Sequence, residues 1–472
     1  MWNTPDVFLI SGEFMKLLDT VAAVSTPYGK GGVALIRISG PDALAVGDKV
    51  FFSASGKALS ALESGRLYYG EIKQGQETLD DVMAVAFRGP RSFTGEDTVE
   101  ISCHGGILVT SRVLGAVLAA GARAAEAGEF TRRAYINGKM RLSEAEALGN
   151  LLDAKTDSQM RLARNGMKGG LSRRTDEIYV KLRDTLTSVY AAIDFPDEDL
   201  SEMSREEICL AVETSASDIE KLAKTYGTGR AINEGIPTVI CGRTNAGKSS
   251  VYNRILGYDA AIVTDIEGTT RDCLRENATL GKTLLRLCDT AGLRETEDTV
   301  ESIGIERARE EMSRAGLVLA VFDVSKPLTE EDIALAREVG ALAVPSVALL
   351  NKTDIQSCDT SSIAEYFDKT VSISAADGRG FDLLSNIIDE MFIDGSIDMN
   401  TDAVVTGARQ YAALTSAAEA LGSALEDLRC DLPLDLCCVA VEVALSALGE
   451  VDGRELGEEI VSEIFSHFCV GK

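Results

Sequence analysis

A glycine-rich segment in the middle of the chain carries the clearest chemical signal. Residues 242–249 read Gly-Arg-Thr-Asn-Ala-Gly-Lys-Ser and follow the apolar run Pro-Thr-Val-Ile-Cys. In a G-x-x-x-x-G-K-[ST] loop between a strand and a helix, backbone N–H groups surround phosphate oxygens, the lysine neutralises the β and γ phosphates, and the hydroxyl ligates Mg²⁺. The spacing therefore predicts that Lys248 supports catalysis and that Ser249 binds Mg²⁺.

Three later segments follow this loop in the order and spacing expected of a GTPase. Residues 289–292, Asp-Thr-Ala-Gly, end an apolar run and put a carboxylate where it can hold Mg²⁺ through water. Residues 351–354, Asn-Lys-Thr-Asp, end another run, and an aspartate there can accept both N1–H and N2–H of guanine, a pair that adenine does not offer. Ser374 and Ala375 stand where GTPases place a backbone amide against guanine O6. Together the four elements predict GTP binding.

A candidate switch loop lies between the first two elements. Residues 264–272 read Thr-Asp-Ile-Glu-Gly-Thr-Thr-Arg-Asp, and Thr270 could supply a second Mg²⁺ ligand. Leu293 stands where a Ras-like enzyme carries the glutamine that orients the attacking water, so another group must position that water. Spacing does not choose among the acidic candidates, which are Glu295, Glu297, Asp298 and Glu301.

The expected GTP-binding residues come from these five segments. They are Asn245, Ala246, Gly247, Lys248, Ser249, Ser250, Thr264, Asp265, Ile266, Glu267, Gly268, Thr269, Thr270, Asp289, Thr290, Ala291, Gly292, Asn351, Lys352, Asp354, Ser374 and Ala375.

The elements that would position these residues change in character along the chain. Residues 1–18 are typical of a non-secretory extension, and residues 19–136 alternate short β-like runs with glycine turns, as an α+β domain does. Residues 137–233 and 396–472 have apolar residues at three- and four-residue spacing and predict helices. Residues 234–395 repeat strand, glycine loop and helix, which predicts a doubly wound, mostly parallel sheet. We expect this GTPase domain to be inserted into an all-helical domain that it splits.

Composition limits the possible partners. The 472 residues include 47 basic and 74 acidic side chains, a net charge of −27. No basic stripe is visible, so any RNA contact must be local or come from a partner, and an anionic membrane is disfavoured. No apolar run reaches the length of about 18 residues typical of a membrane span. The ten cysteines and two histidines suggest neither a disulfide framework nor a zinc site. We expect a cytoplasmic protein.

Many segments, in one order from residue 19 to residue 472, resemble the MnmE (TrmE) family of tRNA-modification GTPases. The segments that carry the resemblance are DTVAAVSTPYGKGGVALIRISG, SFTGEDTVEISCHGG, AGEFTRRAYINGKMRLSEAEAL, AAIDFPDED, GRTNAGKSS, AAIVTDIEGTTRD, DTAGLRETEDTVESIGIERA and FSHFCVGK. The resemblance implies a homodimer formed through an N-terminal tetrahydrofolate-binding domain at 19–136. It also implies a cytoplasmic partnership with the FAD protein MnmG in a heterotetramer.

Together the two proteins would add an aminomethyl or carboxymethylaminomethyl group to C5 of the wobble uridine of certain tRNAs. The one-carbon donor would be 5-formyltetrahydrofolate or a related tetrahydrofolate. Family members hydrolyse GTP when their G domains dimerise around potassium, and a cation there can supply the charge that an arginine finger supplies elsewhere.

The resemblance also assigns individual residues by motif position. The implied K⁺ ligands are Asn245, Thr264, Ile266 and Thr269, and the implied water-orienting carboxylate is Glu301. The implied folate-binding residues are Arg37, Glu100, Lys139 and Lys472. A glutamate can accept a bidentate bond from the pterin edge, and cations can meet the glutamate tail. Cys469 matches a family cysteine associated with the modification itself.

Two other functions compete with this interpretation. In one, the chain is a GTP-switched binding module, such as a ribosome-assembly GTPase, in which hydrolysis only times association. In the other, the folate domain is the catalyst and the G domain only regulates it. The segments RISG, TVEISCHGG and EFTRRAYINGK have no role in a simple switch, and no separate RNA-binding motif is visible.

Overall fold

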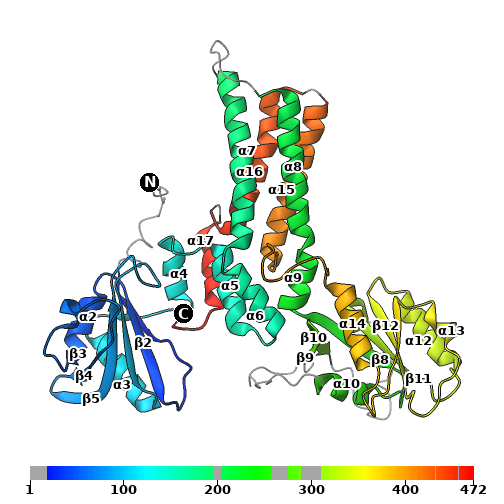
Figure 1. Ribbon diagram of the computed structural model, residues 1–472, viewed down its shortest axis with the longest axis horizontal. Coiled ribbons are helices and arrows are strands. Elements are labelled where there is room, and N and C mark those ends of the chain that lie inside the picture. The colour runs from blue at the N-terminus through cyan, green and yellow to red at the C-terminus, as the bar shows by residue number, and fades with distance from the viewer. Residues whose placement is uncertain are drawn as a thin grey trace. The chain divides into compact units, whose positions relative to one another are not determined.

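The computed structural model describes residues 19–194, 203–257, 275–288, 310–430, 432–454 and 456–471. The chain forms two compact units, which are drawn in Figure 1. One unit combines the two ends of the chain, Met1–Gly149 and Asp452–Lys472. The other is Asn150–Val451.

A seven-stranded sheet forms the centre of the first unit, in the order β3-β4-β5-β6-β2-β1-β7. Its strands are β1 Val21–Val24, β2 Val33–Ser39, β3 Phe51–Ser53, β4 Tyr68–Gln74, β5 Glu77–Phe87, β6 Thr98–His104 and β7 Arg123–Ala124. All neighbours pair antiparallel except β1 and β7. Side chains alternate between faces along a strand, so Ala34, Ile36 and Ile38 of β2 enter the core.

Two helices pack on that core face, α2 (Ala43–Val50) and α3 (Ile107–Ala119), with the short turn η1 (Leu59–Ala61) beside α2. The described residues also form α4 (Glu129–Ile136), α17 (Glu458–Ser466) and α5 (Leu142–Asp153), whose last turn continues into the second unit.

The C-terminal residues lie beside the beginning of the same unit. Val470 forms an antiparallel bridge with Ala127, and Ser25 Oγ donates a hydrogen bond to the Gly471 carbonyl at 2.9 Å. The Tyr135 hydroxyl donates to the carbonyl of Gly453 at 2.7 Å. Residues more than 300 positions apart in sequence therefore belong to one folded unit.

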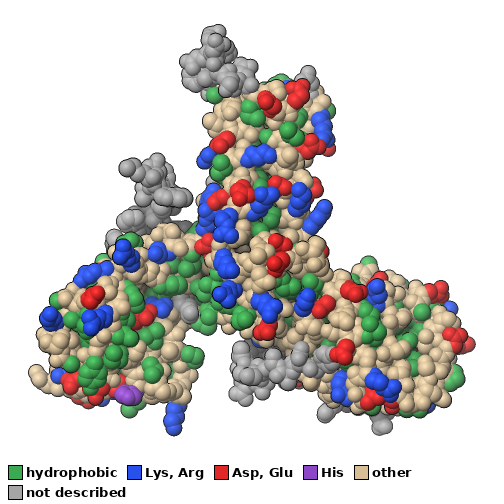
Figure 2. Space-filling view, in the orientation of Figure 1, with side chains coloured by type: hydrophobic (Ala, Val, Ile, Leu, Met, Phe, Trp, Pro, Cys, Tyr) green, Lys and Arg blue, Asp and Glu red, His purple; other side chains and the backbone are tan. Residues whose placement is uncertain are grey.

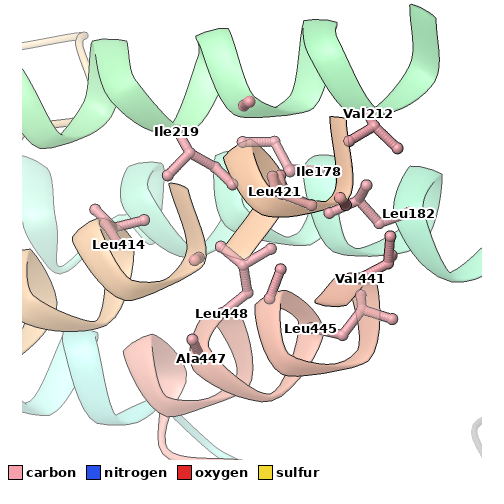
Figure 3. Close-up of a cluster of buried hydrophobic side chains, with 14 of the residues drawn as sticks. Ile178, Leu182, Val212, Ile219, Leu414, Leu421, Val441, Leu445, Ala447 and Leu448 are labelled. Atoms are coloured by element: carbon pink, nitrogen blue, oxygen red, sulfur yellow. The ribbon is translucent and has the colours of Figure 1, made fainter. Parts of the chain in front are cut away.

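Helices from both sides of the α/β segment share a single core in the second unit. They are α7 (Gly170–Asp194), α8 (Arg205–Lys224), α15 (Ala408–Arg429) and α16 (Leu434–Asp452), with Tyr226 of α9 (Tyr226–Asn233) packed against them. Helix α6 (Asp157–Gly166) packs in a separate small cluster through Leu162. Ser204 and Glu207 form a capping box that begins α8. Figure 3 shows the side chains that meet in this core: Ile178, Leu182, Val212, Ile219, Leu414, Leu421, Val441, Leu445, Ala447 and Leu448. The prediction of a split helical domain is confirmed.

The α/β part of the second unit is a six-stranded sheet in the order β13-β12-β11-β8-β10-β9. Its strands are β8 Ile236–Gly242, β9 Arg275–Leu280, β10 Thr283–Cys288, β11 Leu317–Asp323, β12 Ser346–Asn351 and β13 Lys369–Ser372. Only the edge strand β9 pairs antiparallel. The strand order reverses after β8, where ligands bind in doubly wound folds.

Helices cover both faces of this sheet. Along β11, Leu317 and Leu319 enter one core with α10 (Lys248–Leu256) and α14 (Phe381–Phe392). Val318 and Ala320 enter a second core with α12 (Glu330–Gly340) and α13 (Ser361–Ala364). The strands are continuously apolar because both of their faces are buried, as the sequence pattern predicted. Within the described residues, no helix is long and apolar enough to cross a membrane.

Candidate functional site

The glycine-rich loop joins the end of β8 to the start of α10. Asn245 and Gly247 have left-handed backbones, with φ of 64° and 102°. A Cβ on Gly247 would stand 2.2 Å from Asn351 Nδ2, and one on Gly242 would stand 2.5 Å from the Val321 carbonyl oxygen. Glycine is required at both positions by close approach as well as by φ. The first N–H groups of α10 have no acceptor within the helix, so this end of the loop suits an anion.

The lysine of the loop lies across the loop's own backbone. Lys248 Nζ donates to the carbonyl oxygens of Gly242 at 2.8 Å and Arg243 at 2.9 Å. Ser249 and Ser250 are exposed in the first turn of α10. The lysine and the two serines are thus the first residues of α10, at its N-terminus, and phosphate oxygens and Mg²⁺ fit this combination of donors and ligands.

A buried asparagine connects the phosphate loop to the expected guanine loop. Asn351, at the end of β12, is 2% exposed. Its Nδ2 donates to the Ala246 carbonyl at 2.9 Å, and its Oδ1 accepts from the Ala375 amide at 3.0 Å. Both halves of one side-chain amide are therefore used to hold two loops in register.

The neighbouring lysine makes a second connection to the same loop. Lys352 has φ of 69°, and its Nζ donates to the Asn245 carbonyl at 2.8 Å and to Asp323 Oδ2 at 2.6 Å. Burial by itself would raise the pKa of Asp323, but hydrogen bonds from Lys352 and Ser325 outweigh it and lower that pKa. Asp323 was not among the residues predicted from the sequence, although it is the only charged residue of β11 and ends that strand.

The described part of the predicted GTP site gathers at one edge of the sheet. Asn245 to Ser250 follow β8, Asn351 to Asp354 follow β12, and Ser374 and Ala375 follow β13. The Asp354 side chain is exposed. Several predicted residues lie outside the described residues: Thr264, Asp265, Ile266, Glu267, Gly268, Thr269, Thr270, Asp289, Thr290, Ala291, Gly292, Glu301 and Lys472.

The first unit brings together two of the predicted folate residues. Arg37 of β2 and Glu100 of β6 are register partners, and Arg37 Nε and Nη2 contact Glu100 Oε1 at 2.9 and 2.8 Å. No described residue donates to Glu100 Oε2. The Arg37 guanidinium lies 5.3 Å from the Phe93 ring centre and 5.6 Å from that of Phe130. Sequence reasoning missed these two rings.

The other predicted residues of this unit lie near its loops. Lys139 Nζ donates to the Pro90 carbonyl at 2.9 Å, and Asn137 Nδ2 donates to that of Thr94 at 2.7 Å. These bonds anchor the loop that carries Phe93. Cys469 is exposed, and its carbonyl accepts from the Gly128 amide at 3.4 Å.

A buried ionic network holds α4 in the same unit. Arg133 is fully buried and contacts Asp19, Glu96 and Glu129 at 2.7, 3.1 and 2.9 Å. Arg123 also contacts Glu129, at 2.7 Å. Burial alone would raise the pKa of Glu129, but hydrogen bonds from Arg123, the Glu126 amide and Arg133 outweigh it and lower the pKa. The run Thr-Arg-Arg in the sequence is charged and did not reveal a buried network.

The fold and this edge of the sheet define a P-loop GTP-binding protein of the doubly wound class. A model described as the MnmE helical domain matches residues 142–469, and one described as the GTP-binding protein TrmE N-terminus matches residues 20–139. The chain belongs to the MnmE (TrmE) family of tRNA modification GTPases.

Curated relatives match over almost their full length. The tRNA modification GTPase MnmE of Bacillus subtilis (strain 168) is 39% identical over 461 residues, which cover 96% of this chain and 100% of that protein. The protein of the same name from Geobacillus thermodenitrificans (strain NG80-2) is 40% identical over 465 residues, covering 97% and 100%. Among solved structures, the G domain of the T. maritima FeoB iron transporter is 22% identical, with a TM-score of 0.26 and coverage of 33% of this chain and 97% of that one.

Proposed function

We propose that this chain is a potassium-stimulated GTPase that acts with the FAD protein MnmG on tRNA. The two proteins would add an aminomethyl or carboxymethylaminomethyl group to C5 of the wobble uridine, using a tetrahydrofolate one-carbon donor. The observation that carries the proposal is the pair of bonds from Asn351 to Ala246 and Ala375, which joins a phosphate loop to a guanine loop in a chain of this family. We assign the activity to the cytoplasm.

In the GTP site, this chain's residues bind and orient the nucleotide. Lys248 neutralises the β and γ phosphates, and Asp354 accepts the two guanine N–H groups. Ser249 and Thr270 are the proposed Mg²⁺ ligands, and the exposed serine hydroxyl beside Lys248 fits that role. Bound Mg²⁺ supplies charge that offsets the phosphate oxygens. Glu301 is the proposed group that orients the attacking water.

A monovalent cation would complete the charge around the phosphates. Its proposed ligands are Asn245, Thr264, Ile266 and Thr269. Asn245 fits this role because its exposed side chain bonds to no described residue, while its backbone is held by Lys352 at 2.8 Å. An amide oxygen is a suitable hard ligand for such an ion.

The proposed folate site lies around Arg37, Glu100 and Lys139, with Lys472 as a further cation. Glu100 Oε2 is left to accept from a donor outside the protein, and the rings of Phe93 and Phe130 flank Arg37. A flat, hydrogen-bonding pterin suits such a combination of carboxylate and aromatic side chains. Homodimer formation and a heterotetramer with MnmG belong to the same proposal, as does a role for the exposed Cys469 in the modification.

Nucleoside analysis of tRNA tests this proposal. In a strain that lacks the gene, we expect C5-aminomethyl-type wobble uridines to disappear and to return with the wild-type gene. Lys248→Ala should not restore them, because it removes the cation that faces the phosphates. Glu301→Ala should fail as well if hydrolysis drives the work. Mass spectrometry of digested tRNA reads out all four strains.

Two outcomes would favour the competing functions. If the wobble nucleosides are unchanged throughout, and no second copy of the gene exists, the chain is a GTP-switched binding module. If Glu301→Ala restores modification while it abolishes GTP hydrolysis, the G domain is only a regulator. Calorimetry with 5-formyltetrahydrofolate is an independent check, because absence of binding would also favour the switch.

A further inference from the structure

Helix α6 and the residues that flank it, as far as the start of α7, present a set of exposed cations that the GTP site does not use. We define the α6 basic face as Lys155, Arg161, Arg164, Lys168 and Arg173, and each of these side chains is exposed. Arg161, Arg164 and Lys168 are spaced i, i+3 and i+7, so they share one side of α6 and its C-terminal turn. Figure 2 shows Lys and Arg side chains gathered over α6 and the adjoining part of α7.

The local charge is opposite to that of the chain. Between residues 158 and 175 there are five basic residues and no acidic one, whereas the whole chain has a net charge of −27. Asp157, in the first turn of α6, precedes this run, and it forms no ion pair with Arg161. From the sequence we expected no basic stripe, but the structure contains a local one. The net charge of the whole chain hides it, because helical spacing brings a few cations together on one side of α6.

These cations differ from two exposed cations on the neighbouring helices, Arg174 and Lys221, which have acidic partners. Arg174 contacts Glu177 at 2.7 Å and Asp218 at 2.9 Å, and Lys221 contacts Asp218 at 3.1 Å. Among the described residues, none of the five members of the α6 basic face forms an ion pair. The Arg173 side chain donates to the backbone carbonyl of Lys168.

The nearest acidic loop is not their partner. Leu162, on the buried side of α6, packs with Ile393 and Val404 at the two ends of a loop that contains three aspartates. Asp394 accepts from the Ser396 amide, and Asp398 accepts from the Asn400 amide, each at 2.9 Å. These carboxylates are satisfied by their own loop, which leaves the α6 basic face open to another anion.

We propose that the α6 basic face binds the phosphate backbone of tRNA. The proposal rests on the tRNA substrate proposed above. From Arg161 to Lys168 the helix rises about 10 Å, which is about the rise of three nucleotides along a duplex strand, so several phosphates of one strand lie within reach. Unpaired Arg and Lys side chains contact phosphates without regard to base, so this face positions tRNA while other groups choose the uridine.

A triple variant of the full-length protein tests the proposal. Arg161→Gln, Arg164→Gln and Lys168→Gln together should weaken binding of a fluorescent unmodified tRNA transcript about tenfold at 50 mM KCl. The slope of log affinity against log salt should fall in magnitude by about 2.7, because about three phosphate contacts are lost. The loss should be equal for substrate and non-substrate tRNAs. Fluorescence anisotropy at several KCl concentrations measures the affinity, its dependence on salt, and the difference between substrate and non-substrate tRNAs.

The matched control removes three exposed cations elsewhere in the helical part. Lys221→Gln, Lys224→Gln and Arg429→Gln change the net charge by the same amount, but Lys221 and Arg429 have acidic partners. This control should bind tRNA as wild type does. A second variant with Arg161→Lys and Arg164→Lys keeps the charge and should retain most of the affinity. GTP turnover, measured in every preparation, should be unchanged and shows that each variant is folded.

Three results would overturn the proposal. They are unchanged tRNA binding by the triple variant, no salt-sensitive tRNA binding by the wild-type chain, and an altered oligomeric state with tRNA binding unaffected. The last would show that a protein covers this face. Failure of the proposed function can be told apart from failure of this proposal. The proposed function is tested by nucleoside analysis of cellular tRNA, whereas this proposal is tested by tRNA binding in vitro.

Discussion

At the residue scale, one buried side chain organises the nucleotide site. Asn351 uses its donor on Ala246 and its acceptor on Ala375, at 2.9 and 3.0 Å, and it stands 2.2 Å from the place that a Cβ on Gly247 would occupy. The motif by itself suggests contact with guanine. The structure adds that this asparagine holds both loops at a fixed separation. Its loss should therefore weaken the binding of the phosphates and of the guanine base together.

We expect Asn351→Ala to weaken GDP and GTP binding by tenfold or more. The substitution leaves the Ala246 carbonyl and the Ala375 amide without a partner, a cost of about 1–3 kcal/mol. Calorimetry measures the affinity and urea unfolding measures the stability of the α/β part. Asn253→Ala is the matched control, because Asn253 is an exposed asparagine on α10. Equal affinities for the two variants would contradict the role given to Asn351.

At the element scale, α4 is fixed to the first unit by charge as well as by packing. Glu129 begins the helix and is held by Arg123 and Arg133, while Phe130 lies beside Arg37. The position of α4 therefore determines one wall of the proposed folate site. A buried pair costs stability when one partner is removed, because the other charge remains without compensation.

The Glu129 contacts make the stability of α4 depend on pH. The folded pKa of Glu129 is lowered from about 4.5, so its contribution is present above that pH and is lost as pH falls through the lower folded value. At pH 7, Glu129→Gln should increase amide exchange in α4 by an amount equivalent to about 3–5 kcal/mol. As pH falls below about 4.5, wild type should approach the variant.

Hydrogen exchange detected by mass spectrometry across α4 measures this difference at each pH. Glu77→Gln is the control, because Glu77 pairs with Arg112 on the surface, where an ion pair contributes less than about 1 kcal/mol. A difference between wild type and Glu129→Gln that stays constant from pH 7 to pH 3 would show that ionisation of Glu129 is not involved.

At the scale of the whole molecule, two units supply different chemistry. The unit at the chain ends carries Arg37 and Glu100, and the other unit carries the GTP site and the α6 basic face. Hydrolysis that requires two G domains to meet around potassium would couple these functions through the assembly. If two G domains must meet, GTP turnover should depend on potassium and on protein concentration, which it would not do in a self-contained GTPase.

We expect GTP turnover to rise at least about tenfold when sodium is replaced by potassium, because a correctly placed cation stabilises transition-state charge. Turnover per protein should also rise with protein concentration if G domains must meet. Asn245→Ala should lose the response to potassium, while Asn253→Ala should keep it. Steady-state phosphate release in the two salts measures the effect. Equal rates for wild type in both salts would rule out the potassium assignment.

Local sequence patterns were sufficient to predict the fold class and the GTP-binding loops. Continuous apolar runs predicted the parallel strands, and the motifs at their ends predicted Lys248, Asn351 and Ala375 at one edge. The domain boundaries and the residues of the switch loop stay predictions. The contacts of Phe93 with Arg37 were not predictable, because residues 93 and 37 meet only when β2 and the loop before β6 are assembled.

The sequence by itself determined the chemistry of the phosphate loop, since glycine, lysine and serine at fixed spacing act through neighbouring backbone atoms. Only the tertiary structure decided which charges are buried, paired or free. Arg133 and Arg161 have the same side chain, yet Arg133 is fully buried among carboxylates and Arg161 is exposed without an ion pair. The physical reason is that a charge is stabilised by groups close in space, and these partners come from elements that are distant in sequence.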